Sequence, residues 1–554
     1  MDHAGEQALP TSDAARSSAL LARLSDRRTA VVLLLVVYLA VRYRVAFTLD
    51  SPVFGWRPSD MASVALNFER NGFHLFYPQV FWGGAGPGYV ETELMLPSFV
   101  TAILLKVLGV HEYVYLIVPM AVGFALVLAI HRFAAHCGGA AAGLVAGTIA
   151  AVVPTLVLQT TTGLWPDPPM VLCTTWGLYL LVRWAEDDRP RTLAAAAVCL
   201  SLAILLKLTA LYIGVPVLYV FVKKYGGSWW RRGATWSTAA TILLPPALWY
   251  LHAYRLAIEY HNSFGILSLG FSKLGRSEQF TSWKFYAVVA RKIAAYHLTP
   301  LGFGAAIAGV VETAQASLRA DPAGRRALAG RTGHVLLVWL ASVALVTLVA
   351  AKGVQEGHYQ YLLPVLPVGC VFAGLGAAWG MDRARDLATA RGMPRLATAA
   401  AAFAVVAFAA NAASATHRFE THDRADNFAT WAKKKTTGLI VRRLTPPGSL
   451  ILVVDTEMDA VTPERSMTPA DVFYFSDRKG WYQSMAWLSE GRIEQFRREG
   501  ADYLVVSGQS VVDFRTRAAG LYRYLEQNYA SVLDDDDGIV FDMTRPVPDA
   551  RAGK

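Results

Sequence analysis

The sequence predicts a mostly α-helical, multi-pass membrane protein that ends in a soluble α/β domain. Three observations lead to this class. The chain of 554 residues is 54% hydrophobic, and its mean hydropathy of +0.33 exceeds that of an ordinary soluble protein. Its apolar runs reach the length of a membrane-spanning helix, about 20 residues, and short basic clusters separate them. The last part of the chain, residues 415–554, lacks such runs.

About eleven stretches have the composition of membrane-spanning helices. They cover approximately residues 29–47, 113–134, 139–158, 168–186, 192–207, 209–223, 234–252, 299–315, 333–351, 360–379 and 396–414. The two short stretches between residues 192 and 223 are also compatible with one kinked hairpin. If the N-terminus is cytoplasmic, an odd number of crossings predicts that residues 415–554 lie outside.

The distribution of charge supports this topology. The net charge is +10, yet acidic residues slightly outnumber basic ones in residues 415–554, so the basic excess lies in the membrane half. Lys and Arg cluster in the predicted cytoplasmic loops, whereas the predicted outer loops at residues 159–167 and 353–359 contain neither. This is the positive-inside pattern of membrane proteins. It accounts for the positive charge without nucleic acid as a partner.

The polar N-terminus, residues 1–28, is predicted to be disordered and cytoplasmic, and its arginines precede the first apolar run. No small-residue cleavage site follows cleanly, so this region resembles an uncleaved signal anchor. The four cysteines all lie in or beside apolar segments. We therefore expect neither a disulfide framework nor a cysteine metal site.

Residues 48–112 form the most informative segment, a large predicted outer loop after the first crossing. Acidic side chains occur here at Asp60, Glu91 and Glu93, on both sides of a glycine-rich stretch that suits neither a helix nor a strand. Amphipathic segments at residues 61–70 and 94–108 flank that stretch. The second is too short to cross a membrane, because a membrane-spanning helix needs about 20 residues. The loop is predicted to carry carboxylates into a site on the outer membrane surface.

Other polar residues gather on the same predicted face. Asp167 lies between prolines, Lys207 lies at a hairpin tip, and the long loop at residues 253–298 and the polar residues 355–359 follow. Ionisable groups at a membrane edge are costly and usually functional. Lys207 could instead extend its ammonium to the interface, and Asp167 could simply cap the next crossing.

The tail, residues 415–554, is predicted to be a small extracytoplasmic α/β domain. Strands are expected at residues 449–454, 503–507 and 538–542, and helices at 492–498 and 511–527. The acidic run at residues 534–537 is either a solvated turn or a calcium loop, and its spacing matches no calcium-ligand pattern. Residues 477–481 either dock the tail on the membrane face through Trp481 or place that side chain in the core.

Seven stretches, distributed along most of the chain, carry a resemblance to a known family. They are Trp56-Arg57-Pro58-Ser59-Asp60, Glu91-Thr92-Glu93-Leu94 with residues 104–109, Pro166-Asp167-Pro168, residues 206–210, residues 248–254, residues 358–364, and residues 477–481. In order and spacing they resemble bacterial glycosyltransferase family 39. These are polyprenyl-phosphate-sugar-dependent membrane transferases of GT-C fold, related to protein O-mannosyltransferases and to the aminoarabinose transferase of lipid A. The resemblance extends over about residues 29–545.

The resemblance implies that an acceptor hydroxyl attacks the anomeric carbon of a lipid-phosphate sugar and inverts it. Such a reaction needs a carboxylate base and positive charge or a metal at the departing phosphate. The resemblance selects Asp60 as the base and Glu93 for metal or acceptor positioning. Each has a structural alternative: Asp60 could be the N-cap of a helix over residues 61–70, and Glu93 could cap a surface helix.

Phosphate binding must differ from that of the aminoarabinose transferase, in which a lysine follows the matching glutamate. Leu94 stands there in this chain. Lys207 is the expected replacement and Arg57 the second choice, while His358 and Tyr359 could also reach the phosphate. A divalent metal, Mg²⁺ or Mn²⁺, would be held by Glu93 and His358. Further residues expected to line the site are Asp167, Glu91, His261 and Arg276.

The expected partners are a polyprenyl-phosphate-linked sugar, a lipid, glycan or protein acceptor, and membrane lipid. The expected location is the bacterial inner membrane, with the tail outside. The alternative function is a non-enzymatic flippase or transporter of lipid-linked sugars, which would place charges near span midpoints and show internal repeats. The sequence shows neither feature. A scaffold that binds partners through the tail is a third reading.

Overall fold

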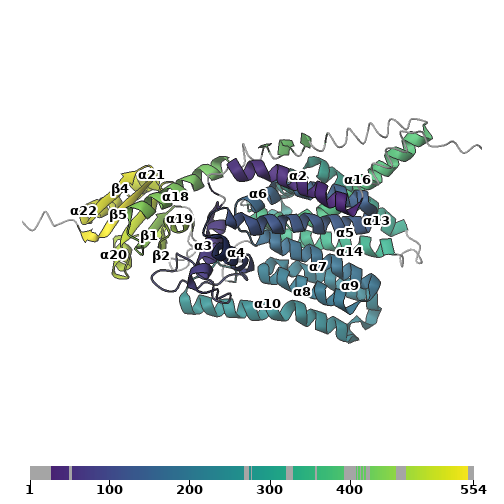
Figure 1. Cartoon of the computed structure of the whole chain (residues 1–554), viewed down its shortest axis with the longest axis horizontal. Helices are drawn as coiled ribbons and strands as arrows, with labels where there is room; N and C mark the ends of the chain where they lie inside the picture. Colours follow the sequence, from purple (N-terminus) through teal and green to yellow (C-terminus); the bar gives the residue numbers. More distant parts are fainter. Residues whose placement is uncertain are drawn as a thin grey trace, which may run out of the picture.

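The computed structural model describes residues 26–48, 51, 53–267, 274–275, 277–319, 328–355, 358–391, 425–456 and 470–546, with single residues between 407 and 418. A bundle of long, roughly parallel or antiparallel helices lies next to a small α/β domain (Figure 1). Two helices of the outer loop, α3 (Trp56–Asn71) and α4 (Leu96–Leu108), lie between the two parts. The predicted class, a mostly helical membrane protein with a C-terminal α/β domain, is confirmed.

Every predicted crossing up to residue 379 coincides with helix. The bundle contains α2 (Arg27–Thr48), α5 (Val114–Val152), α6 (Pro154–Thr161), α7 (Asp167–Asp187), α8 (Pro190–Leu206), η1 (Leu208–Ile213), α9 (Gly214–Tyr225), α10 (Gly233–Tyr260), α13 (Pro300–Arg319), α14 (Leu328–Val349) and α16 (Val365–Ala390). Five stretches of the described residues are long and apolar enough to cross a membrane: Val114–Val152, Leu208–Arg231, Pro300–Leu318, Thr332–Val349 and Val365–Ala390. The predicted crossing at residues 396–414 lies largely outside the described residues.

Helix α5 contains two of the predicted crossings. Its backbone leaves the helical region at Gly138 and at Gly139, which has a φ of 81°. Beyond this turn the second half packs tightly on the first, since a Cβ added at Gly143 would lie 2.6 Å from the Cβ of Ala135. Glycine reaches positive φ without steric cost, so Gly139 permits the reversal between two antiparallel crossings.

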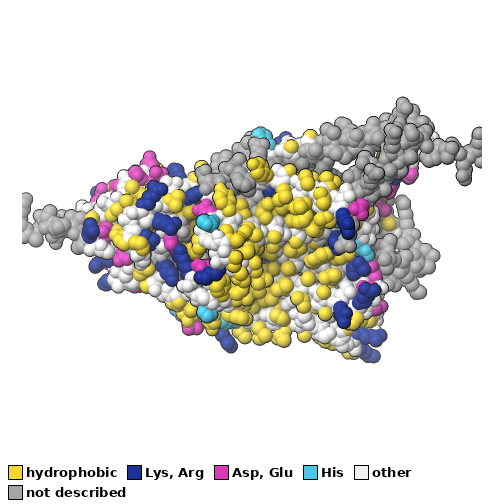
Figure 2. Space-filling model, viewed as in Figure 1, with side chains coloured by type: hydrophobic (Ala, Val, Ile, Leu, Met, Phe, Trp, Pro, Cys, Tyr) yellow, Lys and Arg dark blue, Asp and Glu magenta, His cyan; other side chains and the backbone are white. Residues whose placement is uncertain are grey.

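Side chains of different polarity occupy different parts of the surface of the helical bundle (Figure 2). Figure 2 shows apolar side chains covering the middle of the helical part, and Lys and Arg side chains gathered at the end that lies away from the α/β domain. Exposed leucines of α10, including Leu243, Leu244 and Leu248, contribute to the apolar surface. A lipid bilayer would cover such an apolar surface, and basic side chains gather at one of its two edges (Figure 2).

The soluble domain is a five-stranded sheet in the order β2-β1-β3-β5-β4. Its strands are β1 (Leu450–Asp455), β2 (Lys479–Ser484), β3 (Tyr503–Ser507), β4 (Tyr529–Asp535) and β5 (Gly538–Pro546). β1 pairs in parallel with β2 and β3, and β5 runs antiparallel to β3 and β4. The predicted strands are confirmed as β1, β3 and β5. The two edge strands, β2 and β4, were missed because their sequences contain few β-branched residues and many polar ones.

Helices cover both faces of this sheet. One face packs on α18 (Ala425–Leu444) and α19 (Asp471–Ser476), and the other on α20 (Glu490–Arg498), α21 (Val511–Arg517) and α22 (Ala519–Asn528). The predicted helix at residues 511–527 is thus two helices. The acidic run at residues 534–537 forms the turn between β4 and β5, where Arg515 contacts Asp534 at 2.6 Å. The structure places the end of β4 and the turn to β5 there.

The outer loop and the soluble domain share one apolar core. Met61 and Phe68 of α3 belong to the same buried cluster as Val472 of α19. The backbone of Gly480 in β2 donates to the carbonyl of Phe81 (3.0 Å) and accepts from the amide of Gly84 (2.7 Å), which joins the outer loop to the sheet edge.

Residues 477–481 take part in this contact. Both guanidinium nitrogens of Arg70 donate to the carboxylate of Asp477, at 2.6 and 3.0 Å. The half-buried Trp481 packs on Phe496 of the soluble domain and lies next to Gly84. The side chain therefore contributes both to the domain core and to the docked surface.

Replacing Gly480 with alanine should destabilise the soluble domain by about 3 kcal/mol, the upper part of the range for overpacked sites. An added Cβ would lie 1.8 Å from the carbonyl oxygen of Ile451 in the neighbouring strand, so the backbone must shift. Thermal unfolding and limited proteolysis of the full chain in detergent would measure the loss. Gly491→Ala is the matched control, because no atom lies within 4 Å of its Cβ position. Wild-type unfolding of Gly480→Ala would contradict the described pairing of β1 with β2.

Candidate active site

Asp60 lies in the second turn of α3, not at its start. The helix begins at Trp56, and its N-cap is Gly55, whose φ of 98° suits glycine and which offers no side-chain cap. The alternative reading of Asp60 as the N-cap of a helix over residues 61–70 is therefore wrong. The reason is that the sequence Trp56-Arg57-Pro58 extends the helix by one turn, with proline in a first-turn position that needs no amide hydrogen.

The Asp60 carboxylate is enclosed, with 1% of the residue exposed. Burial raises its pKa to about 8, although a hydrogen bond from Trp82 and the nearby charge of Arg57 oppose the shift, and the charge of Asp471 adds to it. Trp82 Nε1 donates to Asp60 Oδ1 at 2.8 Å. Because solvent has almost no access, a substrate reaches this carboxylate only when its neighbours move.

Glu93 is paired with a cation and does not cap a helix. α4 starts at Leu96 with Met95 as its N-cap, so the alternative reading of Glu93 as a surface-helix cap is wrong. Its carboxylate accepts a hydrogen bond from the guanidinium of Arg57, and both side chains are buried. The Arg57 guanidinium also stacks over the ring of Phe264, 4.4 Å from the centroid. Arg57 is thus held both by the Glu93 carboxylate and by the Phe264 ring.

Glu91 connects the outer loop to the segment after α10. Its carboxylate accepts hydrogen bonds from the Ser263 hydroxyl and, at 3.1 Å, from the amide of Leu267. Burial raises the pKa of Glu91 above its usual value. Three residues further on, the Leu94 amide donates to the carbonyl of Leu205 at 2.9 Å. These contacts hold residues 91–94 beside the outer end of α8.

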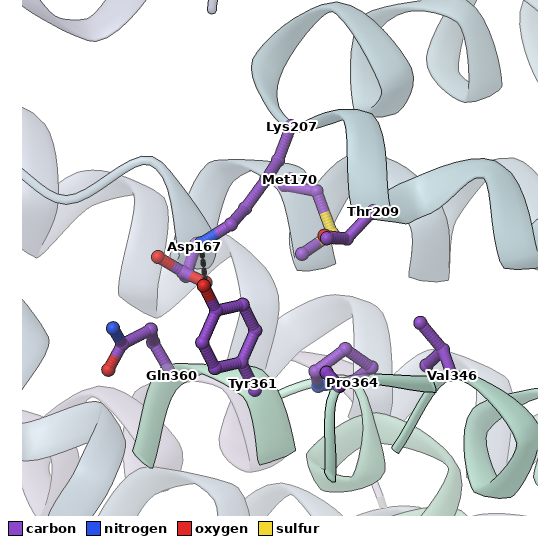
Figure 3. A pocket seen from close by; sticks show the side chains of 9 residues that line it. Asp167, Met170, Lys207, Thr209, Val346, Gln360, Tyr361 and Pro364 are labelled. Carbon is purple, nitrogen blue, oxygen red and sulfur yellow. Dashed lines mark hydrogen bonds and ion pairs between the residues drawn. The ribbon is translucent and has the colours of Figure 1, made fainter. Parts of the chain in front are cut away.

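Lys207 forms an ion pair with Asp167 at 2.6 Å. It lies between α8 and η1, where the chain turns out of the helix with φ −163° and ψ 122°. Its ammonium also lies 5.6 Å from the centroid of the Tyr361 ring, and Figure 3 shows Asp167, Lys207 and Tyr361 pointing toward one another. The side chain is therefore directed inward, not toward the interface, and Asp167 does more than begin α7.

A narrow cavity borders this ion pair. Its volume is about 10 Å³, which is enough for roughly one water molecule. Its lining comes from α7, from the α8–η1 turn and η1, from the end of α14 and the residue after it, and from the turn at residues 359–364 that precedes α16: Asp167, Met170, Lys207, Thr209, Val346, Ala350, Gln360, Tyr361 and Pro364. The charges of Glu93 and Arg57 also act on Asp167. The two ion pairs and Asp60 therefore form one charged site at the outer end of the bundle.

Of the remaining predicted site residues whose side chains the structure describes, only His358 contacts residues that line the cavity. His358 contacts the ring of Tyr361 and the amide of Gln360, whereas the side chain of Tyr359 and the whole of Arg276 lie outside the described residues. His261 is exposed and ends α10 with a φ of 58°. The next two residues, not His261, bond to the outer loop.

The structure gives no set of metal ligands among the residues that it describes. No group of three or more His, Cys, Asp or Glu side chains could hold an ion there. Glu93 is engaged with Arg57, and His358 contacts Gln360 at 3.4 Å. The metal-binding role of Glu93 and His358 remains a prediction.

Sequence reasoning missed Trp82, Gln360, Tyr361 and Asp471. Tyr361 could have been identified from its spacing to His358. Residues 359–362 form the 3₁₀ turn η6 (Tyr359–Leu362), in which residues three apart share a face. His358 and Tyr361 have this spacing and are in contact. Trp82 and Asp471 meet α3 from segments distant in sequence, so no local pattern identifies them.

Comparison with known proteins gives matches for part of the sequence and for the whole fold. Residues 93–250 match the family model described as dolichyl-phosphate-mannose-protein mannosyltransferase. No curated protein sequence matches the chain.

Solved structures share the fold. ArnT from Cupriavidus metallidurans bound to undecaprenyl phosphate superposes with a TM-score of 0.60 at 14% identity, covering 94% of this chain and 98% of that one. The apo oligosaccharyltransferase of Archaeoglobus fulgidus gives 0.59 at 12% identity, covering 91% and 72%. AglB from Archaeoglobus fulgidus, in complex with an inhibitory peptide and a dolichol-phosphate, gives 0.55 at 12% identity, covering 91% and 72%. The resemblance to GT-C glycosyltransferases is confirmed, and these structures establish the shared fold.

Proposed function

We propose that this chain, a membrane protein with the fold of GT-C glycosyltransferases, transfers a sugar from a polyprenyl-phosphate donor to an acceptor hydroxyl with inversion. The match of residues 93–250 to a mannosyltransferase family model supports this activity. The superposition on ArnT bound to undecaprenyl phosphate supports a polyprenyl-phosphate donor. The transferred group would be a hexosyl or pentosyl unit.

One observation carries the proposal: a buried carboxylate and two buried or half-buried cations meet at the outer end of the bundle. Asp60 lies on the side where α3 contacts the soluble domain. Lys207 lies at the outer end of α8, among membrane-spanning helices. A lipid carries its phosphate at the membrane surface, so the donor would approach Lys207 from the bilayer and the acceptor would approach Asp60 from outside.

The residues have the chemistry that the reaction needs. The acceptor oxygen forms a bond to the anomeric carbon while the bond from that carbon to the phosphate oxygen breaks. Asp60 takes the hydroxyl proton, which is the role of a general base. Lys207 and, second to it, Arg57 neutralise the negative charge that develops on the leaving phosphate. Glu93 holds Arg57 in place for this role.

We further propose the cellular arrangement. The site and the soluble domain lie at one end of the bundle, and Figure 2 shows a group of Lys and Arg side chains at the opposite end of the bundle, in addition to those on the soluble domain. The proposed domains are a cytoplasmic N-terminus at residues 1–28, a GT-C membrane domain at 29–414, and an extracytoplasmic domain at 415–554. The proposed location is the bacterial inner membrane.

Mass spectrometry of envelope lipids and glycans, with and without the protein, tests this function. The wild-type protein should add one sugar to one class of lipid, glycan or protein, and the Asp60→Asn variant at equal abundance should not. Identical envelopes with and without the wild-type protein would contradict a transferase. A flippase would change where lipid-linked sugars accumulate and would keep this effect in Asp60→Asn.

A further inference from the structure

The soluble domain places a second carboxylate beside Asp60. Asp471, the first residue of α19, is 2% exposed. Its Oδ1 accepts a hydrogen bond of 2.5 Å from the Ser59 hydroxyl, across 412 positions of sequence. Ser59 directly precedes Asp60 on α3, and the charges of Asp471 and Asp60 act on each other. The proposed base Asp60 and a second buried carboxylate, Asp471, therefore come from two different domains and lie close together.

Packing holds Asp471 in this position. Val472 and Phe473 belong to the core shared by α3 and the sheet. The ring of Tyr474 meets that of Tyr115 edge-on, with centroids 6.0 Å apart. Because α19 touches both the sheet and α3, the position of Asp471 depends on the docking of the whole soluble domain.

We propose that Asp471 is a positioning residue for the transfer reaction: it anchors Ser59 and places a negative charge that keeps Asp60 a strong proton acceptor while the soluble domain is docked. This inference rests on the proposed function. It makes the soluble domain part of the active site, since the membrane domain alone would lack the second carboxylate.

The basicity of Asp60 depends on the groups that face its carboxylate. Arg57 from the same helix and the Trp82 indole from the outer loop favour the charged form of Asp60, and Asp471 from α19 opposes it. A like charge close to a buried acid raises its pKa, so Asp471 and burial act in the same direction. Without Asp471, burial alone would oppose Trp82 and Arg57, so the pKa of Asp60 would be lower and Asp60 would be a weaker base.

The test is the pH dependence of transfer by purified full-length protein in lipid nanodiscs. For the wild type, kcat/KM should rise with pH, be half-maximal near pH 8 and level off about one pH unit higher, because the base acts as the carboxylate. In Asp471→Asn the amide oxygen still accepts from Ser59, but the charge is gone. The rise should therefore move about one pH unit lower, and the rate at high pH should fall roughly threefold, as expected for a weaker base.

Three comparisons separate this role from a structural one. Asp471→Glu keeps the charge and should keep the wild-type position of the rise. Asp477→Asn removes the ion pair with Arg70 and should lower the thermal midpoint without moving the rise. Asp513→Asn removes a carboxylate that pairs with Arg517 on the far helix α21 and should match the wild type in both measurements.

The inference would be overturned if kcat/KM of Asp471→Asn rose over the same pH range as that of the wild type, in protein with the wild-type thermal midpoint. So would a rise that moves equally in Asp477→Asn, because docking alone would then explain it. If the wild type transferred no sugar, the proposed function itself would fail. That outcome is distinct from a wild type that is active and an Asp471→Asn variant whose profile is unchanged.

Discussion

Replacing Asp60 with asparagine should lower the transfer rate by about two to four orders of magnitude while the protein stays folded. Asparagine has nearly the same size, and its amide oxygen can accept the hydrogen bond that Trp82 donates at 2.8 Å. At neutral pH the buried Asp60 is largely protonated, because burial raises its pKa to about 8. A neutral amide therefore replaces a largely neutral acid, and what is lost is the ability to take a proton.

Thermal stability gives a second readout of the same substitution. The folded protein holds the Asp60 proton up to about pH 8, whereas the unfolded chain releases it near the usual pKa of about 3.9. The unfolded state binds fewer protons between these values, so wild-type stability falls as pH rises through this window. Asp60→Asn lacks this dependence. Its thermal midpoint should therefore rise relative to that of the wild type as the pH increases from 5 to 8.

The control for both measurements lies on the same helix. Glu69 pairs with Lys106 at 3.1 Å near the surface, and Glu69→Gln should change stability by less than about 1 kcal/mol and leave the transfer rate unchanged. Wild-type turnover in purified Asp60→Asn would refute its role as the base, and Glu93 would then be the next carboxylate to test.

Replacing Lys207 with alanine should both weaken donor binding and destabilise the protein. From the sequence alone, loss of this lysine is expected to leave folding intact. The structure changes that expectation, because Lys207 is the ion-pair partner of the buried Asp167 at 2.6 Å. Removing one partner of a buried pair leaves an uncompensated charge and costs about 3–5 kcal/mol.

A double variant separates the two effects. Lys207→Ala combined with Asp167→Asn removes both charges and should recover most of the lost stability. Binding of undecaprenyl phosphate, measured by calorimetry in nanodiscs, should remain about ten- to a hundredfold weaker than in the wild type, since a hydrogen bond to a charged group contributes about 1.5–3 kcal/mol.

The matched control is Lys223→Ala, an exposed lysine at the other end of the bundle that lies over the ring of Tyr219. It should bind undecaprenyl phosphate as the wild type does. If the double variant bound the lipid phosphate with wild-type affinity, Lys207 would not be the phosphate ligand, and Arg57 would be the remaining candidate.

Much of the fold follows from local composition. Apolar runs of membrane length became the helices of the bundle, and the glycine pair at residues 138–139 separated two crossings that the helix α5 joins. β-branched runs became the inner strands β1, β3 and β5. These features are local because a membrane-spanning segment satisfies its backbone hydrogen bonds within itself, and because a buried strand needs apolar residues on both faces.

The sequence by itself also predicted that Asp60, Glu93 and Lys207 gather on one face, since charged residues are rare enough near membrane spans to be conspicuous. Their partners were decided only by the tertiary structure. Trp82 meets Asp60, Arg57 meets Glu93, and Asp471 arrives from the last domain of the chain. The pKa of a buried carboxyl depends on the distance and sign of such neighbours, and packing between distant segments sets both. Composition therefore indicates where the charged residues gather, whereas the basicity of Asp60 depends on how the soluble domain docks onto α3.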